Sequence, residues 1–156
     1  MRLNLSSAFL CNTKAGKAMI AAGNGGRILN ISSTAGINLN PGRAAYAAAK
    51  AGMISFPMSL TLSWASDGIN VSCIAPGFTA TEGIRKRGIV PSETRKDGTT
   101  VLALLMPNES ELMAHVAVFL ASPASAHVTG ELMIVGNMFH MERSDDVIRD
   151  RTSLTQ

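Results

Sequence analysis

Aromatic side chains are rare in this 156-residue sequence, and charged side chains are not abundant. Aromatic residues make up 4% of the chain and charged residues 16%, whereas hydrophobic residues make up 46%. Small and aliphatic residues must therefore fill the interior, which favours closely packed helices and strands over a β-sandwich. The apolar content excludes a disordered chain, and the length predicts one domain with one core.

Long apolar runs and clustered positive charge are also missing. No stretch is long enough to cross a bilayer, and Lys14 and Lys17 interrupt the short apolar patch near the N-terminus, so no signal peptide is expected. We expect a cytoplasmic protein without a membrane partner. The net charge is +3, but the basic residues are dispersed apart from 85–87 and 95–96, which argues against a nucleic-acid partner.

Cysteine occurs only twice, as Cys11 and Cys73. Both residues have apolar neighbours, and their spacing does not suit a metal site. We expect two buried thiols in a reducing compartment, with no disulfide and no bound metal.

Helical and strand patterns alternate along the chain. Helices are predicted over 3–22, 43–66 and 109–122, and strands over 27–32, 69–75 and 131–135. Asn108 suits the N-cap of the last helix, Pro57 predicts a kink in the second, and 78–107 reads as irregular. Since the strands have no alternating polarity, an α/β fold with a parallel sheet covered on both faces is predicted.

Three features follow directly after the predicted strands. Ser33 follows the first strand, Pro76 and Gly77 follow the second, and Gly136 follows the third. Ligands of parallel sheets bind beyond the carboxyl ends of the strands. These residues therefore mark the expected ligand side of the sheet.

Tyr46 and Lys50 are four residues apart on the second predicted helix, so their side chains share one face. A phenol titrates near ~10, and a neighbouring ammonium lowers that pKa because it favours the phenolate. Such a phenol can give or take a proton at a carbonyl or alcohol oxygen. The spacing alone is a weak signal, and by itself it favours a surface pair on an amphipathic helix.

Several consecutive stretches together resemble one known family. NLSSAF, GGRILNISSTAG, YAAAKAG, GINVSCIAPGFTAT and FLASPASAHVTGELMIV resemble, in order, the signatures of the short-chain dehydrogenase/reductase family, over Asn4 to Val135. The resemblance is strongest to the branch that includes 3-oxoacyl-carrier-protein reductases and hydroxysteroid dehydrogenases. It implies that residues 1–156 form a single, incomplete, doubly wound Rossmann-like domain, the C-terminal part of the fold.

The resemblance implies a set of catalytic residues. Tyr46 would be the general acid in reduction and the base in oxidation. Lys50 would lower the pKa of that phenol and bind the nicotinamide ribose. Ser33 would hold the substrate oxygen, in preference to Ser32, which strand alternation turns away. Asn4 would position a water that links Lys50 to solvent.

The resemblance also implies the ligands and partners. The cofactor would be NAD or NADP, with Pro76 and Gly77 against the nicotinamide and Thr79 and Thr81 near its carboxamide, in addition to Tyr46 and Lys50. The substrate would be an apolar ketone, 3-oxoacyl thioester or secondary alcohol. The helices that carry Asn4 and Tyr46 would pack between subunits of a homodimer or homotetramer. The alternative is a truncated, non-catalytic fragment that acts as an oligomerising module.

Two departures from the family pattern have consequences. The first strands and the Gly-rich turn of the family have no counterpart here, so we expect an exposed edge on the 27–32 strand and poor cofactor binding by this chain alone. After the last strand, Gly136-Asn137-Met138 stands where the family has Asp-Gly-Gly. The tail from about 139 is expected to be disordered.

Overall fold

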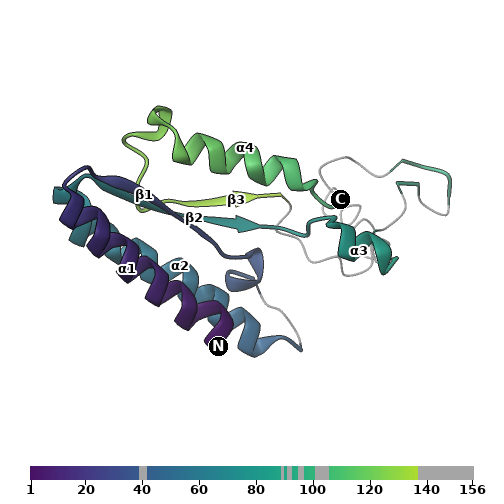
Figure 1. The fold of residues 1–156 in the computed structure, drawn as a ribbon. Coiled ribbons are helices and arrows are strands. Elements are labelled where there is room, and N and C mark those ends of the chain that lie inside the picture. The colour runs from purple at the N-terminus through teal and green to yellow at the C-terminus, as the bar shows by residue number, and fades with distance from the viewer. Residues whose placement is uncertain (39–41, 89, 91–92, 95–96, 101–105, 137–156) are drawn as a thin grey trace, which may run out of the picture.

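In the computed structural model, a parallel sheet lies at the centre of the chain (Figure 1). The structure describes residues 1–38, 42–88, 90, 93–94, 97–100 and 106–136. In that part of the chain the strands are β1 (Gly26–Ile31), β2 (Ile69–Pro76) and β3 (Leu132–Val135), in spatial order β1-β2-β3. The predicted α/β class and the parallel pairing are confirmed.

Helices cover both faces of the sheet. A widened π-type turn, η1 (Arg2–Ser6), leads into α1 (Ser7–Ala22), which lies with α2 (Ala44–Trp64) on one face. The helix α4 (Ser110–Ala121) lies on the other face (Figure 1). The short helices are η2 (Thr34–Gly36), η3 (Ala65–Asp67), α3 (Glu82–Lys86) and η5 (Pro123–Ser125).

The core lies around β2, the middle strand. Residues Val71 to Ala75 are all buried because helices cover this strand from both sides. On the α1 and α2 face, a cluster of apolar side chains closes the interior: Ile28, Ile69 and Val71, with Ala15, Met19 and Trp64 packed against them. The continuous apolar run that predicted this strand therefore reflects burial on two faces.

A buried amide pair joins α1 to β1. Asn12 Nδ2 donates to Asn30 Oδ1 at 2.8 Å, and Asn30 Nδ2 donates back to Asn12 Oδ1 at 2.9 Å. Both residues are only 5% exposed, and buried amides need partners. The pair therefore fixes how α1 lies along β1.

Three sequence-based expectations need correction. The N-cap residue of α4 is Glu109 and not Asn108, because Asn108 instead pairs with the segment that follows β2. Cys11 is exposed, and only Cys73 is buried, since apolar neighbours in sequence do not tell which side of a helix faces the sheet. The segment 78–107, expected to be irregular, contains α3.

Other expectations keep their standing as predictions. Pro57 is buried inside one continuous α2, and the kink expected there stays a prediction. The tail from about 139 lies outside the described residues. No helix in the described part of the chain combines the length and the apolar character that a membrane span requires.

Candidate functional site

Ser33 lies directly beyond the carboxyl end of β1. Its backbone is extended, and its Oγ accepts a hydrogen bond from the Ala35 amide at 3.2 Å, which starts the turn η2. Ser32, one residue earlier, is buried and donates through its hydroxyl to Lys50 O at 2.7 Å. The two serines therefore have separate tasks, as strand alternation predicts.

The turn η2 is seated tightly against α2. A Cβ added at Gly36 would lie 2.7 Å from both Ala51 N and Lys50 C. Such an approach of two backbones is open only to glycine. Gly36 thereby holds the turn of Ser33 against the part of α2 that carries Lys50.

Lys50 ties α2 to the end of β1. Its Nζ donates to Ile31 O at 3.0 Å and lies 5.8 Å from the centroid of the Tyr46 ring. At that distance an ammonium is attracted by an aromatic ring. Lys50 and Tyr46 are both half-buried. The structure thus brings the serine turn, the phenol and the ammonium to one end of β1.

Asn4 lies in η1, the widened turn that precedes α1. Leu5 of this turn packs against Gly52 of α2, so closely that a Cβ added at Gly52 would lie 2.9 Å from the Cδ atoms of Leu5. Turns of this π type occur often at functional sites. The turn η1, which contains Asn4, contacts α2, the helix that contains Lys50. Within the described residues, however, the side chain of Asn4 makes no direct hydrogen bond to Lys50.

The residues predicted to line the nicotinamide lie at the same edge, at the last residue of β2 and directly beyond it. Pro76 pairs with Val135, and Gly77 N donates to Val135 O at 2.9 Å. Thr79 Oγ1 donates to Gly77 O at 3.2 Å. Thr81 is exposed at the N-terminus of α3, and its side chain makes no capping hydrogen bond there.

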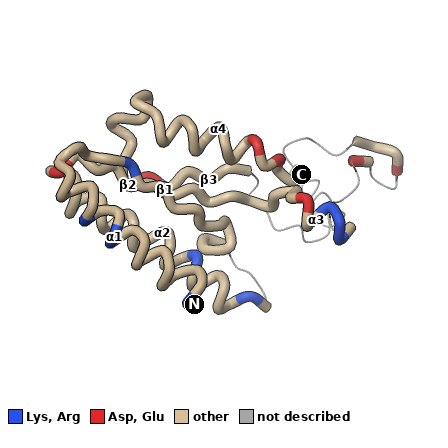
Figure 2. Tube along the Cα trace, in the orientation of Figure 1, with Lys and Arg blue, Asp and Glu red and all other residues tan. Residues whose placement is uncertain are grey.

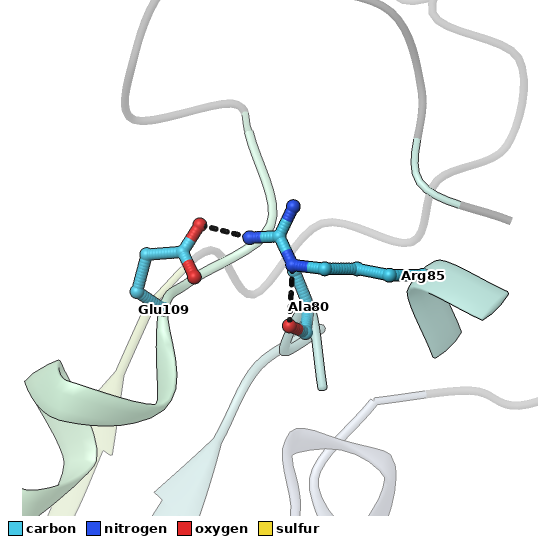
Figure 3. A network of polar contacts seen from close by, with 3 residues as sticks. All are labelled: Ala80, Arg85 and Glu109. Atoms are coloured by element: carbon cyan, nitrogen blue, oxygen red, sulfur yellow. Dashed lines mark hydrogen bonds and ion pairs between the residues drawn. The ribbon is translucent and has the colours of Figure 1, made fainter. Parts of the chain in front are cut away.

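Sequence reasoning missed a tie between α3 and α4. The Arg85 guanidinium pairs with Glu109, and its Nε donates to Ala80 O at 3.1 Å (Figure 3). The hydrogen bond with Glu109 raises the pKa of Arg85. Lys86 pairs with Glu82 at 2.6 Å, and this four-residue spacing of opposite charges was the signal for a short helix.

The basic residues do not gather on one element of the described chain. Figure 2 shows them spread over α1, the start of α2 and α3, with acidic residues beside those of α3. A basic run such as 85–87 can either contact a phosphate-bearing carrier or form a solvated charge run. Since Arg85 and Lys86 are engaged with carboxylates, the structure favours the second.

An apolar groove of about 550 Å³ lies between η1, α1 and α2, and none of the predicted site residues lines it. It is lined by Leu5, Ser6, Phe9, Leu10, Gly52, Ser55 and Phe56. Among these lining residues, the ring centroids of Phe9 and Phe56 lie 5.7 Å apart. Because its lining offers few polar groups, the groove suits an apolar surface better than a reacting carbonyl.

Comparisons with known proteins show which family the chain belongs to. The family model described as Enoyl-(Acyl carrier protein) reductase matches residues 1–137. A 3-oxoacyl-[acyl-carrier-protein] reductase of Synechocystis sp. is 39% identical over 130 residues, which cover 83% of this chain and 50% of that protein. The 3-oxoacyl-[acyl-carrier-protein] reductase FabG of Rickettsia conorii is 38% identical over 133 residues, 85% of this chain and 54% of that protein.

Solved structures show the same fold. Acetoin dehydrogenase YohF from Salmonella typhimurium superposes with a TM-score of 0.71 at 30% identity, over 85% of this chain and 50% of that one. Acetoin dehydrogenase from Enterobacter cloacae does so with a TM-score of 0.71 at 29% identity, over 85% of this chain and 50% of that one. The chain spans about half the length of the relatives it matches.

Proposed function

Since this chain belongs to the short-chain dehydrogenase/reductase family, we propose that it carries the catalytic residues of an NAD(P)-dependent oxidoreductase. The reaction interconverts a ketone or 3-oxoacyl group and a secondary alcohol. One observation supports this proposal most directly. The Lys50 ammonium is held by Ile31 O at the end of β1, beside the ring of Tyr46.

Tyr46 handles the proton in this proposal. In the reducing direction, its hydroxyl gives a proton to the carbonyl oxygen as that oxygen gains negative charge. In the oxidising direction, the phenolate takes the proton of the alcohol. The Lys50 ammonium lies beside this ring, with Nζ 5.8 Å from its centroid, where it would hold the nicotinamide ribose next to the phenol.

Ser33 orients the substrate oxygen. Its Oγ accepts the Ala35 amide, so its own hydrogen remains for donation to an oxygen outside the turn. A donor aimed at the place where charge develops lowers the barrier of the chemical step. The seat that Gly36 provides against α2 makes this donor a fixed one. Asn4, in the turn before α1, would hold the water that links Lys50 to solvent.

The donors at this edge fit a nicotinamide nucleotide. Lys50 Nζ has three N–H groups, of which Ile31 O accepts one, and the others suit ribose hydroxyls. Thr81 has a hydroxyl that α3 does not use as a cap, and Thr79, Pro76 and Gly77 lie beside it along the chain. When bound, NAD or NADP supplies or accepts the hydride.

The proposed substrate is a 3-oxoacyl thioester. Both curated relatives described above are named 3-oxoacyl-[acyl-carrier-protein] reductases. Apolar residues of the segment 78–107, which fit an apolar substrate, include leucines within 101–105, outside the described residues. The experiment that tests the activity joins the other half of the Synechocystis relative to this chain and follows NADPH and NADH oxidation. We expect turnover with a 3-oxoacyl thioester; a folded, cofactor-binding chimera without turnover contradicts the proposal.

The second candidate is an oligomerising module without activity, and exposed apolar residues favour it. Leu3 is 91% exposed, Leu62 88%, Leu10 58% and Phe9 52%, all on η1, α1 and α2. A homodimer or homotetramer built on these helices would cover them. Light scattering on the chain alone tests self-association. The oligomerising module is supported over the enzyme if the chain forms a dimer and if neither the chain nor the chimera binds or oxidises NAD(P)H.

A further inference from the structure

We propose that Asn108 is a positioning residue that locks the segment 77–81 onto β3. This inference rests on the proposed function only for its consequence, because 77–81 is the segment assigned to the nicotinamide. The lock itself follows from contacts around Asn108. These contacts come from the backbone, from the side chain and from the space left by Gly136.

The backbone of Asn108 extends the sheet beyond β2. Asn108 N donates to Phe78 O at 2.8 Å, and Ala80 N donates to Asn108 O at 2.8 Å. Together these bonds form a parallel bridge between Thr79 and Asn108. The chain just before α4 is thereby paired with the segment that carries Thr79 and Thr81.

The side chain of Asn108 adds a second connection. Its Nδ2 lies 3.4 Å from Phe78 O and 3.3 Å from Val135 O. An amide nitrogen has two hydrogens, so it can serve both carbonyls at once. Val135 O also accepts Gly77 N at 2.9 Å. One side chain therefore bridges the end of β3 and the segment that follows β2.

Gly136 leaves the space that this amide occupies. A Cβ at position 136 would lie 1.7 Å from Asn108 Nδ2 and 2.5 Å from its Cγ. Gly136 also has a φ of +103°, which side chains rarely adopt. A side chain at 136 and the amide of Asn108 thus exclude each other. We infer that the two positions are coupled, and that the glycine serves to admit the asparagine.

The consequence is a fixed segment beside the site. Arg85 Nε holds Ala80 O from α3, but Arg85 is exposed, whereas Asn108 is half-buried and is held by the bridge to Thr79. Without the amide, residues 77–81 should move relative to β3. Thr79 and Thr81 would then lose their set distance from Lys50, which weakens cofactor binding more than it slows the chemical step.

Amide hydrogen exchange on the chain tests the lock without any cofactor. In Asn108→Ala we expect exchange of the amides of Gly77 and Ala80 to rise about tenfold or more, while that of Val71 to Ala75 stays unchanged. Asn70→Ala is the matched control, since Asn70 Nδ2 holds Ala126 O at 2.9 Å at the opposite end of β2. It should leave 77–81 protected. Equal exchange of 77–81 in Asn108→Ala and the parent chain overturns the proposal.

The coupling is tested by exchanging the two residues. Gly136→Asn alone should lower Tm strongly, and Asn108→Gly together with Gly136→Asn should lower it by less than the sum of the single effects. Additive effects overturn the coupling. In the chimera that supplies the relatives' other half, Asn108→Ala should raise KM for NAD(P)H several-fold with kcat nearly unchanged. If the chimera fails to bind cofactor, the proposed function is contradicted. The hydrogen-exchange experiment needs no cofactor, so it still tests whether Asn108 locks the segment 77–81.

Discussion

The two ends of the parallel strands, which form two opposite edges of the sheet, carry different kinds of contact. Where the strands begin, the contacts close the fold: Gly26 N donates to Gly68 O, Asn70 Nδ2 to Ala126 O, and Val71 N to Thr129 Oγ1. Where the strands end, three segments carry the candidate site residues: the turn after β1 with Ser33, the helix α2 with Tyr46 and Lys50, and the segment 77–81 with Thr79 and Thr81.

With the proposed function, this difference assigns stability to one end of each strand and chemistry to the other. Parallel strands all begin at one edge and end at the other, so loops at the far edge can carry reactive side chains while the near edge is closed by small residues and amides. Substitutions at the beginning of β2 should therefore lower stability and spare turnover. Substitutions around its end should reduce turnover or local order first.

The largest effect is expected from Gly36→Ala, at the site edge. The new Cβ would lie 2.7 Å from backbone atoms of Lys50 and Ala51, which cannot move without shifting α2. We expect a loss of about 1–3 kcal/mol in the free energy of unfolding and loss of turnover in the chimera. Gly52→Ala is the control, because there the Cβ meets only the end of the Leu5 side chain. If Gly36→Ala and Gly52→Ala lower the free energy of unfolding and the turnover equally, the close packing of η2 against α2 is contradicted.

Asn70→Ala tests the opposite edge. Its Nδ2 contacts the carbonyl oxygens of Ser125, Ala126 and Val128 at 3.4, 2.9 and 3.3 Å. Loss of these bonds should cost about 1–3 kcal/mol of stability, measured by urea unfolding. Turnover per folded chimera should stay the same. A fall in kcat without a fall in stability would show that the two edges are not separated.

Cys73 lies between the two edges and gives stability a pH dependence. Burial raises the pKa of its thiol to about 11 from an ordinary value of 9.0, against smaller lowering effects of the Ser32 backbone and Lys50. The folded chain then keeps a proton that the unfolded chain releases. The contribution of the protonated Cys73 thiol to the free energy of unfolding is therefore fully present below pH 9. It is lost between about pH 9 and 11, by at most about 1.4 kcal/mol per pH unit. Cys73→Ala should remove that part of the slope, and an unchanged slope contradicts the prediction.

The smallest effect is expected from the exposed pair of Arg85 and Glu109. Both side chains are about half exposed, at 49% and 58%, so salt screens them. Glu109→Gln should leave Tm nearly unchanged and modestly raise exchange of the Ala80 amide at low salt. At high salt the variant and the parent chain should agree. A large loss of Tm would give this tie a structural weight that its exposure does not support.

Strand and helix order could be predicted because each depends on local pattern. The buried run of β2 and the spacing of Tyr46 and Lys50 both come from neighbours in sequence. Position along the chain also placed Ser33 beyond β1. The resemblance supplied the proposed roles of Asn4 and Thr81, which no pattern of their own indicates.

The missed features depend on contacts between distant segments. Asn108 looked like a helix cap because Asn commonly caps helices, but its partners are Phe78 and Val135. Cys11 is exposed because the sheet covers the other side of α1. The seat of Gly36 against Lys50 depends on how β1 and α2 meet, which sequence spacing does not encode.

The most direct test of the central claim is the pH profile of NAD(P)H-dependent reduction in the chimera, with and without Tyr46→Phe. Removal of the proton donor should lower kcat by about 10²–10⁴-fold, with cofactor binding largely retained because Lys50 and the segment 77–81 stay in place. Ser33→Ala should lower kcat by a smaller factor. A Tyr46→Phe variant that keeps the parent turnover and the parent pH profile would contradict the assignment of this phenol as the acid and base.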